Sequence, residues 1–71
     1  MLGKLIKEYI VAHGMRQKDI GEAIGLDAEK MYAICKGIRK IEAVEYFDIC
    51  KELGVPVDYF WKILEGQTVE G

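Results

Sequence analysis

Proline, histidine and long hydrophobic runs are scarce in this chain, and each shortage excludes a class of protein. The 71 residues include one proline and one histidine. No apolar run approaches the roughly 18 residues that a membrane-spanning helix needs. The N-terminus also lacks the apolar core of a signal peptide, because Lys4, Lys7 and Glu8 interrupt it. We therefore expect a soluble, cytoplasmic protein with no membrane partner.

Cysteine is scarce as well. Cys35 and Cys50 each have apolar neighbours, which favours buried thiols in a reducing compartment over a disulfide or a ligand pair. With one histidine and no paired cysteines, the sequence predicts no zinc site. His13 is expected to interact favourably with the partial negative charge at the C-terminal end of the first helix. There is also no nucleophile motif, no paired carboxylate motif and no phosphate loop. We expect no metal, no cofactor and no catalytic residue, and hence no enzyme.

Strand-like alternation of apolar and polar residues is absent too. Apolar residues instead recur at helical spacing, in segments that glycines separate. This pattern predicts an all-α protein. Residues 1–66 are expected to form one domain and residues 67–71 a flexible C-terminal tail. The expected helices are Leu2–His13, Gln17–Ile24, Ala28–Cys35, a fourth from Glu42 or its neighbour to Leu53, and Tyr59–Leu64.

The second and third expected helices are short, and a turn containing Gly25 joins them. Asp27 is placed to cap the third helix, whereas Arg16 is a poor cap for the second. Met31 and Ile34 are expected to point inward from the third helix. Two short helices across a tight turn are typical of the helix-turn-helix motif, whose second helix enters the major groove of DNA.

Apolar spacing also predicts which faces of the other helices are buried. The first helix carries an apolar stripe that includes Ile6 and Ile10, with Val11 at its edge. Phe60 is the expected core residue of the fifth helix. In the fourth helix, apolar residues recur every three positions and are expected to face the core; they are Val44, Phe47, Cys50 and Leu53.

The charge is unevenly distributed along the chain. The formal net charge of −2 alone argues weakly against a nucleic-acid partner. Residues 1–40, however, contain eight Lys or Arg and five Asp or Glu, a balance of +3. Residues 41–71 contain two and seven, a balance of −5. The two short helices lie in the basic half, as a surface that faces phosphates requires.

Several segments share their joint spacing with one known family. They are residues 2–7 (LGKLIK), 13–17 (HGMRQ), 19–26 (DIGEAIGL), 53–60 (LGVPVDYF), and Met31, Ile34 and Gly37 with its basic loop. In this spacing the chain resembles the lambda-repressor-like DNA-binding domains, the Cro/C1 family of helix-turn-helix regulators, from Leu2 to about Trp61. The resemblance implies a five-helix domain, double-stranded DNA as partner and a role in transcription regulation. The size and fold fit a phage or prophage regulator.

The resemblance also implies a set of DNA-binding residues. Gln17 matches a glutamine that contacts the DNA backbone or braces the recognition helix. The base-contacting positions hold two alanines, a glutamate and a tyrosine, where family members usually carry Gln, Ser, Thr, Arg or Asn. Direct readout is therefore thin, which favours weak specificity or readout of DNA shape. These positions are Ala28, Glu29, Tyr32 and Ala33, and the phosphate candidates are Lys18, Lys30, Lys36, Arg39 and Lys40.

A second departure from the family concerns the core. Many members carry Arg and Glu, as a partly buried ion pair, at the positions of Ile10 and Cys35. Both residues are apolar here. Replacing both partners of such a pair can be neutral or stabilising, whereas replacing one strands a charge. We therefore expect Ile10 and Cys35 to be in contact.

Two functions remain open at this point. The first is the DNA-binding regulator, with Tyr59 and Trp61 as a candidate homodimer interface, because aromatic residues concentrate at interface centres. The second is a protein-binding module, antirepressor-like, that has lost base readout and captures another regulator protein. The acidic second half of the chain and the Ala28 and Glu29 positions motivate this alternative.

Overall fold

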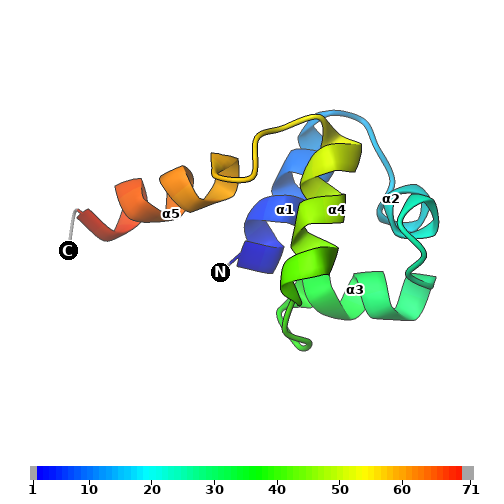
Figure 1. The fold of residues 1–71 in the computed structure, drawn as a ribbon. Helices are drawn as coiled ribbons and strands as arrows, with labels where there is room; N and C mark the ends of the chain where they lie inside the picture. Colours follow the sequence, from blue (N-terminus) through cyan, green and yellow to red (C-terminus); the bar gives the residue numbers. More distant parts are fainter. Residues whose placement is uncertain (1, 70–71) are drawn as a thin grey trace.

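Five α-helices make up the part of the chain that the computed structural model describes, which is residues 2–69, with side chains described to residue 66. The helices are α1 (Leu2–Ala12), α2 (Gln17–Ala23), α3 (Ala28–Lys36), α4 (Ala43–Leu53) and α5 (Tyr59–Val69). No strand occurs within that range, so the protein is all-α as the sequence predicts. Figure 1 shows α1 to α4 gathered into one body and α5 pointing away from it.

Each connection between two successive described helices contains a glycine in the left-handed conformation. Gly14, Gly25, Gly37 and Gly54 have φ between 68° and 83°, a region that glycine enters without a steric cost. The first three helices therefore end within one residue of the predicted ends, at Ala12, Ala23 and Lys36. The end predicted for the fifth helix, Leu64, is wrong, because α5 continues to Val69. Residues 70–71 of the expected tail lie outside the described range.

The core is built from one stripe of each helix. No polar or charged side chain is buried in the described part of the chain. Ile10 and Cys35 both belong to the buried cluster. Phe60 is buried, as predicted. The cluster also contains Ile6, Ile20, Met31, Ile49, Cys50 and Leu53.

Two glycines permit close crossings between helices. A Cβ atom on Gly3 would lie 2.0 Å from the backbone oxygen of Ile34, so α1 and α3 meet backbone to backbone at this point. A Cβ atom on Gly21 would lie 3.1 Å from the Met31 side chain. The main packing pairs are α1 with α3 and α5, and α2 with α3 and α4.

The predicted inner face of α4 is confirmed at Cys50 and Leu53 and is wrong at Val44 and Phe47. Val44 and Phe47 are 69% and 52% exposed, whereas Ile49, Cys50 and Leu53 are buried. A helix turns about 100° per residue, so a series at every third position drifts about 60° per step, and Val44 ends up opposite Leu53. Val11, at the edge of the α1 stripe, is also exposed, at 66%. None of the described helices is both long enough and apolar enough to span a membrane.

Candidate nucleic-acid interface

α2, the turn that follows and α3 form one tightly connected unit. The backbone N–H of Leu26 donates to the Gly21 carbonyl at 2.8 Å, which closes the turn. Asp27 then caps α3, its carboxylate accepting from the Lys30 N–H at 2.8 Å, as the sequence predicts. Arg16 precedes α2 without a side-chain cap, also as predicted. The turn is therefore fixed from the α3 side.

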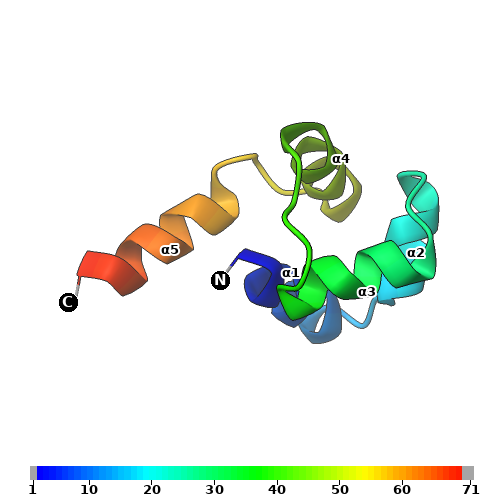
Figure 2. The same ribbon diagram turned by 90° about the horizontal axis from the view of Figure 1, so that it is seen from below.

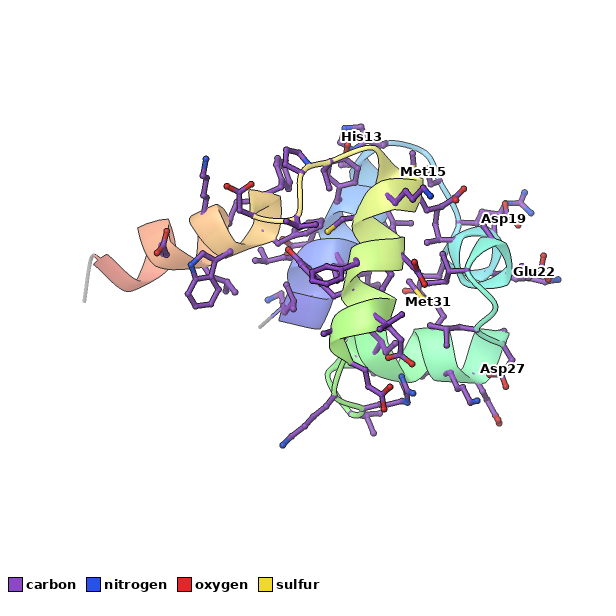
Figure 3. The ribbon with its side chains drawn as sticks, in the orientation of Figure 1. His13, Met15, Asp19, Glu22, Asp27 and Met31 are labelled. Atoms are coloured by element: carbon purple, nitrogen blue, oxygen red, sulfur yellow. The ribbon has the colours of Figure 1, made fainter. Side chains whose placement is uncertain are left out.

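The inner face of α3 is buried and its outer face is open. Met31, Ile34 and Cys35 are buried. In Figure 3 the Met31 side chain points from α3 into the body of the molecule. Figure 2 views the molecule from the side of α3, and no other helix passes in front of it. The base-contact candidates lie on the open face: Ala28, Glu29 and Tyr32 are exposed and Ala33 is half-buried.

The open face changes in charge along α3. Asp27 and Glu29 place two carboxylates at its N-terminal end, and Figure 3 shows Asp27 directed outward there. At the other end, the Lys36 ammonium lies 5.8 Å from the centre of the Tyr32 ring, within the range of a cation–π contact. Carboxylates repel DNA phosphates, so the C-terminal end of α3 is the more favourable one for a polyanion.

Arg39 is held in an ion pair. Its Nη1 and Nη2 donate to the two carboxylate oxygens of Glu45 at 2.9 and 2.8 Å. The pair raises the pKa of Arg39 and, with the Glu42 N–H bond, lowers the pKa of Glu45. The charge of Lys30 makes a smaller contribution to the same lowering. Of the predicted phosphate contacts, Arg39 is the one that a described ion pair holds.

Lys36 and Lys40 are in no described ion pair. They line a hollow between α1 and the end of α3, together with Arg39, Lys4 and Lys7. The sequence analysis assigned no role to Lys4 or Lys7. Their spacing of three residues puts them on one helical face, and a glycine at position 3 is the signal that this face passes close to another backbone. The other predicted contacts are on the first turn of α2, where Lys18 is exposed and Gln17 is half-buried.

The two aromatic candidates for a dimer interface lie in different surroundings. Trp61, 59% exposed, lines a second hollow of about 350 Å³ with Phe47 and Val57. Tyr59 does not line this hollow; its ring packs edge-on against Tyr9 and Phe60, with centroids 5.6 and 5.0 Å away. Tyr59 is 36% exposed, less than Trp61, and both aromatic residues stay candidates for the interface.

Tyr46 forms one wall of the Trp61 hollow and ties α4 to the turn before α5. Its hydroxyl donates to the Val57 carbonyl. Burial is the main cause that raises the pKa of Tyr46 to about 12. The hydroxyl therefore stays protonated, and the bond stays intact, at neutral pH.

The contacts of His13, Cys35 and Cys50 indicate structural roles. His13 donates from Nδ1 to the Tyr9 carbonyl at 2.9 Å and stacks on the Tyr9 ring, so it satisfies the end of α1 as expected. Cys35 and Cys50 are buried free thiols, and burial raises the pKa of both. Among the residues described, no group of three His, Cys, Asp or Glu side chains could hold a metal ion.

Comparison with known proteins gives one similar protein. No family model matches the chain, and no solved structure matches it. The chain is 30% identical over 64 residues to a protein of Rhodospirillum rubrum described as an uncharacterized transcriptional regulator in the ATPase CF(0) region. The match covers 90% of this chain and 59% of that protein, so the chain spans less than two thirds of its relative's length.

Proposed function

We propose that this protein is a DNA-binding transcriptional regulator of the Cro/C1 helix-turn-helix type, with α3 as the recognition helix in the major groove. The observation that carries the proposal is the open outer face of α3, which is fixed from behind by Met31, Ile34 and Cys35 and by the capped turn. The description of the R. rubrum relative as a transcriptional regulator supports the same role.

Base contacts in this proposal come from few side chains. Glu29 can accept from a cytosine amino group, and Tyr32 can contact a phosphate or a sugar. Ala28 and Ala33 can only contact a thymine methyl group. Discrimination between sequences then depends mainly on DNA shape and deformability, and the protein is a weakly specific binder.

Phosphate contacts supply most of the affinity. Lys36 and Lys40 at the end of α3 are the strongest candidates, because no carboxylate pair holds them. Lys18 and the Gln17 amide add contacts from α2. Lys30 is a further candidate, and Arg39 contributes less, because Glu45 already neutralises part of its charge. The protein binds and does not catalyse.

A homodimer completes the proposed mode of binding. Trp61 and the apolar side chains around it, Phe47 and Val57, would be covered by a second copy. A two-fold dimer would place two copies of α3 about one DNA turn apart. Trp61→Ala is expected to shift sedimentation from dimer to monomer, with Tyr59→Phe as the aromatic control that should leave the dimer intact.

Binding to duplex DNA tests the proposal directly. Fluorescence anisotropy with labelled genomic fragments at several salt concentrations should show saturable binding, and the logarithm of the affinity should fall by roughly 0.9 per phosphate contact for each tenfold rise in salt. Absence of saturable binding at low salt on every fragment would overturn it.

Removing a charge from the open face of α3 tests whether this face, and not another part of the molecule, contacts DNA. Glu29→Gln removes a carboxylate from the outer face of α3 and should raise DNA affinity about threefold, which is the size of one exposed charge interaction. Glu65→Gln on α5 removes the same charge elsewhere and should change the affinity much less. Equal effects of the two variants would mean that α3 is not the DNA-facing helix.

The second candidate function is a protein-binding module that has kept the fold without base readout. The two carboxylates at the N-terminal end of α3, Asp27 and Glu29, favour it, because they oppose entry into a groove lined by phosphates. A stoichiometric protein complex that survives Lys36→Gln with Lys40→Gln, and is lost with Trp61→Ala, would favour this function over the first.

A further inference from the structure

A long hollow lies between α1 and the C-terminal end of α3, and we call it the α1 groove. Its volume is about 880 Å³, and residues from Leu2 to Ala12 line one side of it, so it follows α1 over its whole length. Eleven residues of α-helix extend about 16 Å, or three turns. The opposite wall is the end of α3 and the following loop to Ile41.

The floor of the α1 groove is apolar. Ile34 and Cys35 form its base, and Leu2, Val11 and Ile41 form its sides. Val11 lies in the last turn of α1 and is 66% exposed although its side chain is apolar. Exposed apolar surface of this kind, contiguous and rimmed by polar residues, is typical of a binding site.

The rim of the α1 groove is basic. Lys4, Lys7, Lys36 and Lys40 line it, together with Arg39, whose guanidinium is held by Glu45, and with Glu8 as the acidic residue. The described ion pairs, Arg39 with Glu45 and Lys62 with Asp58, involve none of these four lysines. An occupant must therefore offer several negative charges together with an apolar stripe.

These features select one kind of occupant. A DNA backbone would use the lysines but not the apolar floor. A fatty acid would use the floor but bring one carboxylate to four lysines. An amphipathic helix with acidic flanks satisfies both, and a groove three helical turns long matches the i, i+3, i+4 and i+7 anchors by which such helices dock. We propose that the α1 groove binds an acidic amphipathic helix of a partner protein.

One consequence concerns DNA. Lys36 and Lys40 belong both to the rim of the α1 groove and to the proposed phosphate contacts. A helix bound in the groove would neutralise them and lower the affinity for DNA. The groove proposal itself does not depend on DNA binding, because its expected result is peptide binding measured without DNA.

The test uses a designed probe. A fluorescently labelled peptide of about 14 residues, with leucine at i, i+3, i+4 and i+7 spacing and glutamate elsewhere, is titrated with the full chain. A peptide of the same composition in scrambled order, without an apolar stripe, is the control for non-specific charge attraction. We expect the amphipathic peptide to bind at least about tenfold more tightly than the scrambled one, since only it can bury apolar surface.

Matched variants locate the binding site. Lys4→Glu with Lys7→Glu should weaken peptide binding by at least about tenfold, and Lys51→Glu with Lys62→Glu, the same change elsewhere, by less than about twofold. Val11→Ser should also weaken binding, whereas Val44→Ser should not, although Val44 is equally exposed on α4. Circular dichroism and a ¹⁵N–¹H spectrum of each variant verify that the fold is retained, and peptide-induced shifts should centre on Val11 and Ile41.

Three results would overturn the proposal. Equal binding of the ordered and scrambled peptides would show charge attraction alone. Shifts centred on Phe47 and Trp61 would move the binding site to the other hollow. DNA binding that depends on Lys4 and Lys7, with no peptide binding, would make a phosphate backbone the occupant of the rim.

Discussion

Of the two flanks of α3, the one that faces the start of α4 has a carboxylate that holds Arg39, whereas the one that faces α1 has lysines in no described ion pair around an apolar floor. Arg39 donates twice to Glu45 and also lines the α1 groove, so it lies between the two flanks. Lys36 and Lys40 share the α1 groove with two lysines of α1. The end of α3 and the loop after it thus supply one cation that an ion pair holds, Arg39, and two that no described ion pair holds, Lys36 and Lys40.

The difference between the flanks comes from what each neighbouring helix contributes. α4 begins with a capping box in which Glu45 accepts from the Glu42 N–H at 3.1 Å, so a carboxylate is already fixed in position when Arg39 reaches it. α1 contributes Lys4 and Lys7 at the corresponding place on the other flank. A count of positive residues along the sequence cannot separate paired cations from free ones, and only the free ones attract a polyanion strongly.

The largest expected effect tests the crossing on which the α1 flank depends. Gly3→Ala should lower the free energy of unfolding by about 3 kcal/mol, because the added Cβ would lie 2.0 Å from the Ile34 carbonyl oxygen and must push α1 from α3. Urea unfolding monitored by circular dichroism measures the change. The same substitution at Gly66 of α5, where a Cβ meets nothing within 4 Å, should be neutral or stabilising by up to about 1 kcal/mol. A stable Gly3→Ala variant would refute the close crossing.

The next effect compares free and paired cations. Lys36→Gln should reduce DNA affinity about threefold and lower the salt slope by roughly 0.9, and adding Lys40→Gln should bring the loss to about tenfold. Arg39→Gln together with Glu45→Gln removes an ion pair without changing the net charge, so it should have a smaller effect on both quantities. Anisotropy at several salt concentrations measures both. If this double substitution matches Lys36→Gln, the distinction between paired and free cations is wrong.

The sequence predicts the local features of this molecule well. Asp27 and the left-handed glycines act through their own backbone neighbours, so their effects on α2 and α3 could be derived without a fold. The same holds for the inner face of α3, where Met31 and Ile34 are buried as expected.

Features that depend on packing between helices could not be derived in this way. The inner face predicted for α4 failed in its first half because a spacing of three drifts around a helix, so that Val44 and Phe47 are exposed. The role of Gly3 depends on where α3 crosses α1, and the Arg39–Glu45 pair depends on where α4 begins. The candidate site was therefore predicted as a set of residues, but not as two flanks with different charge environments.

A smaller effect separates capping from charge at the N-terminal end of α3. Asp27→Ala should lower the free energy of unfolding by about 1 kcal/mol, because the Lys30 N–H loses its acceptor at 2.8 Å. Asp27→Asn keeps a side-chain acceptor and should lower the free energy of unfolding by only a few tenths of the Asp27→Ala effect. Both variants remove the same carboxylate, so both should raise DNA affinity equally. Thermal unfolding and DNA titration of the two variants measure the two quantities, and a DNA effect that follows stability instead of charge would contradict this interpretation.

The smallest effect concerns the pH dependence of the paired flank. The Arg39 hydrogen bond, followed by the Glu42 N–H bond, holds the pKa of Glu45 below its ordinary value of 4.5 in the folded protein. The unfolded chain therefore binds a proton at a higher pH than the folded one, and the pair stabilises the fold above about pH 4.5 and stops doing so as the pH falls through the lowered pKa. Arg39 adds nothing to this window, because the hydrogen bond to Glu45 raises the pKa of its guanidinium, which stays charged throughout.

Glu45→Gln should accordingly lower the melting temperature at pH 7, by no more than about 4 °C for a partly exposed pair in a domain of this size. The gap between the two proteins should close as the pH is lowered below 4.5. Asp58→Asn, which removes the exposed Lys62 pair of α5, is the matched control and should show no such convergence. Parallel melting curves for Glu45→Gln and the unchanged protein at every pH would mean that Glu45 does not hold Arg39 in solution. Arg39 would then be as free to meet phosphate as Lys36, and the two flanks of α3 would be electrostatically alike.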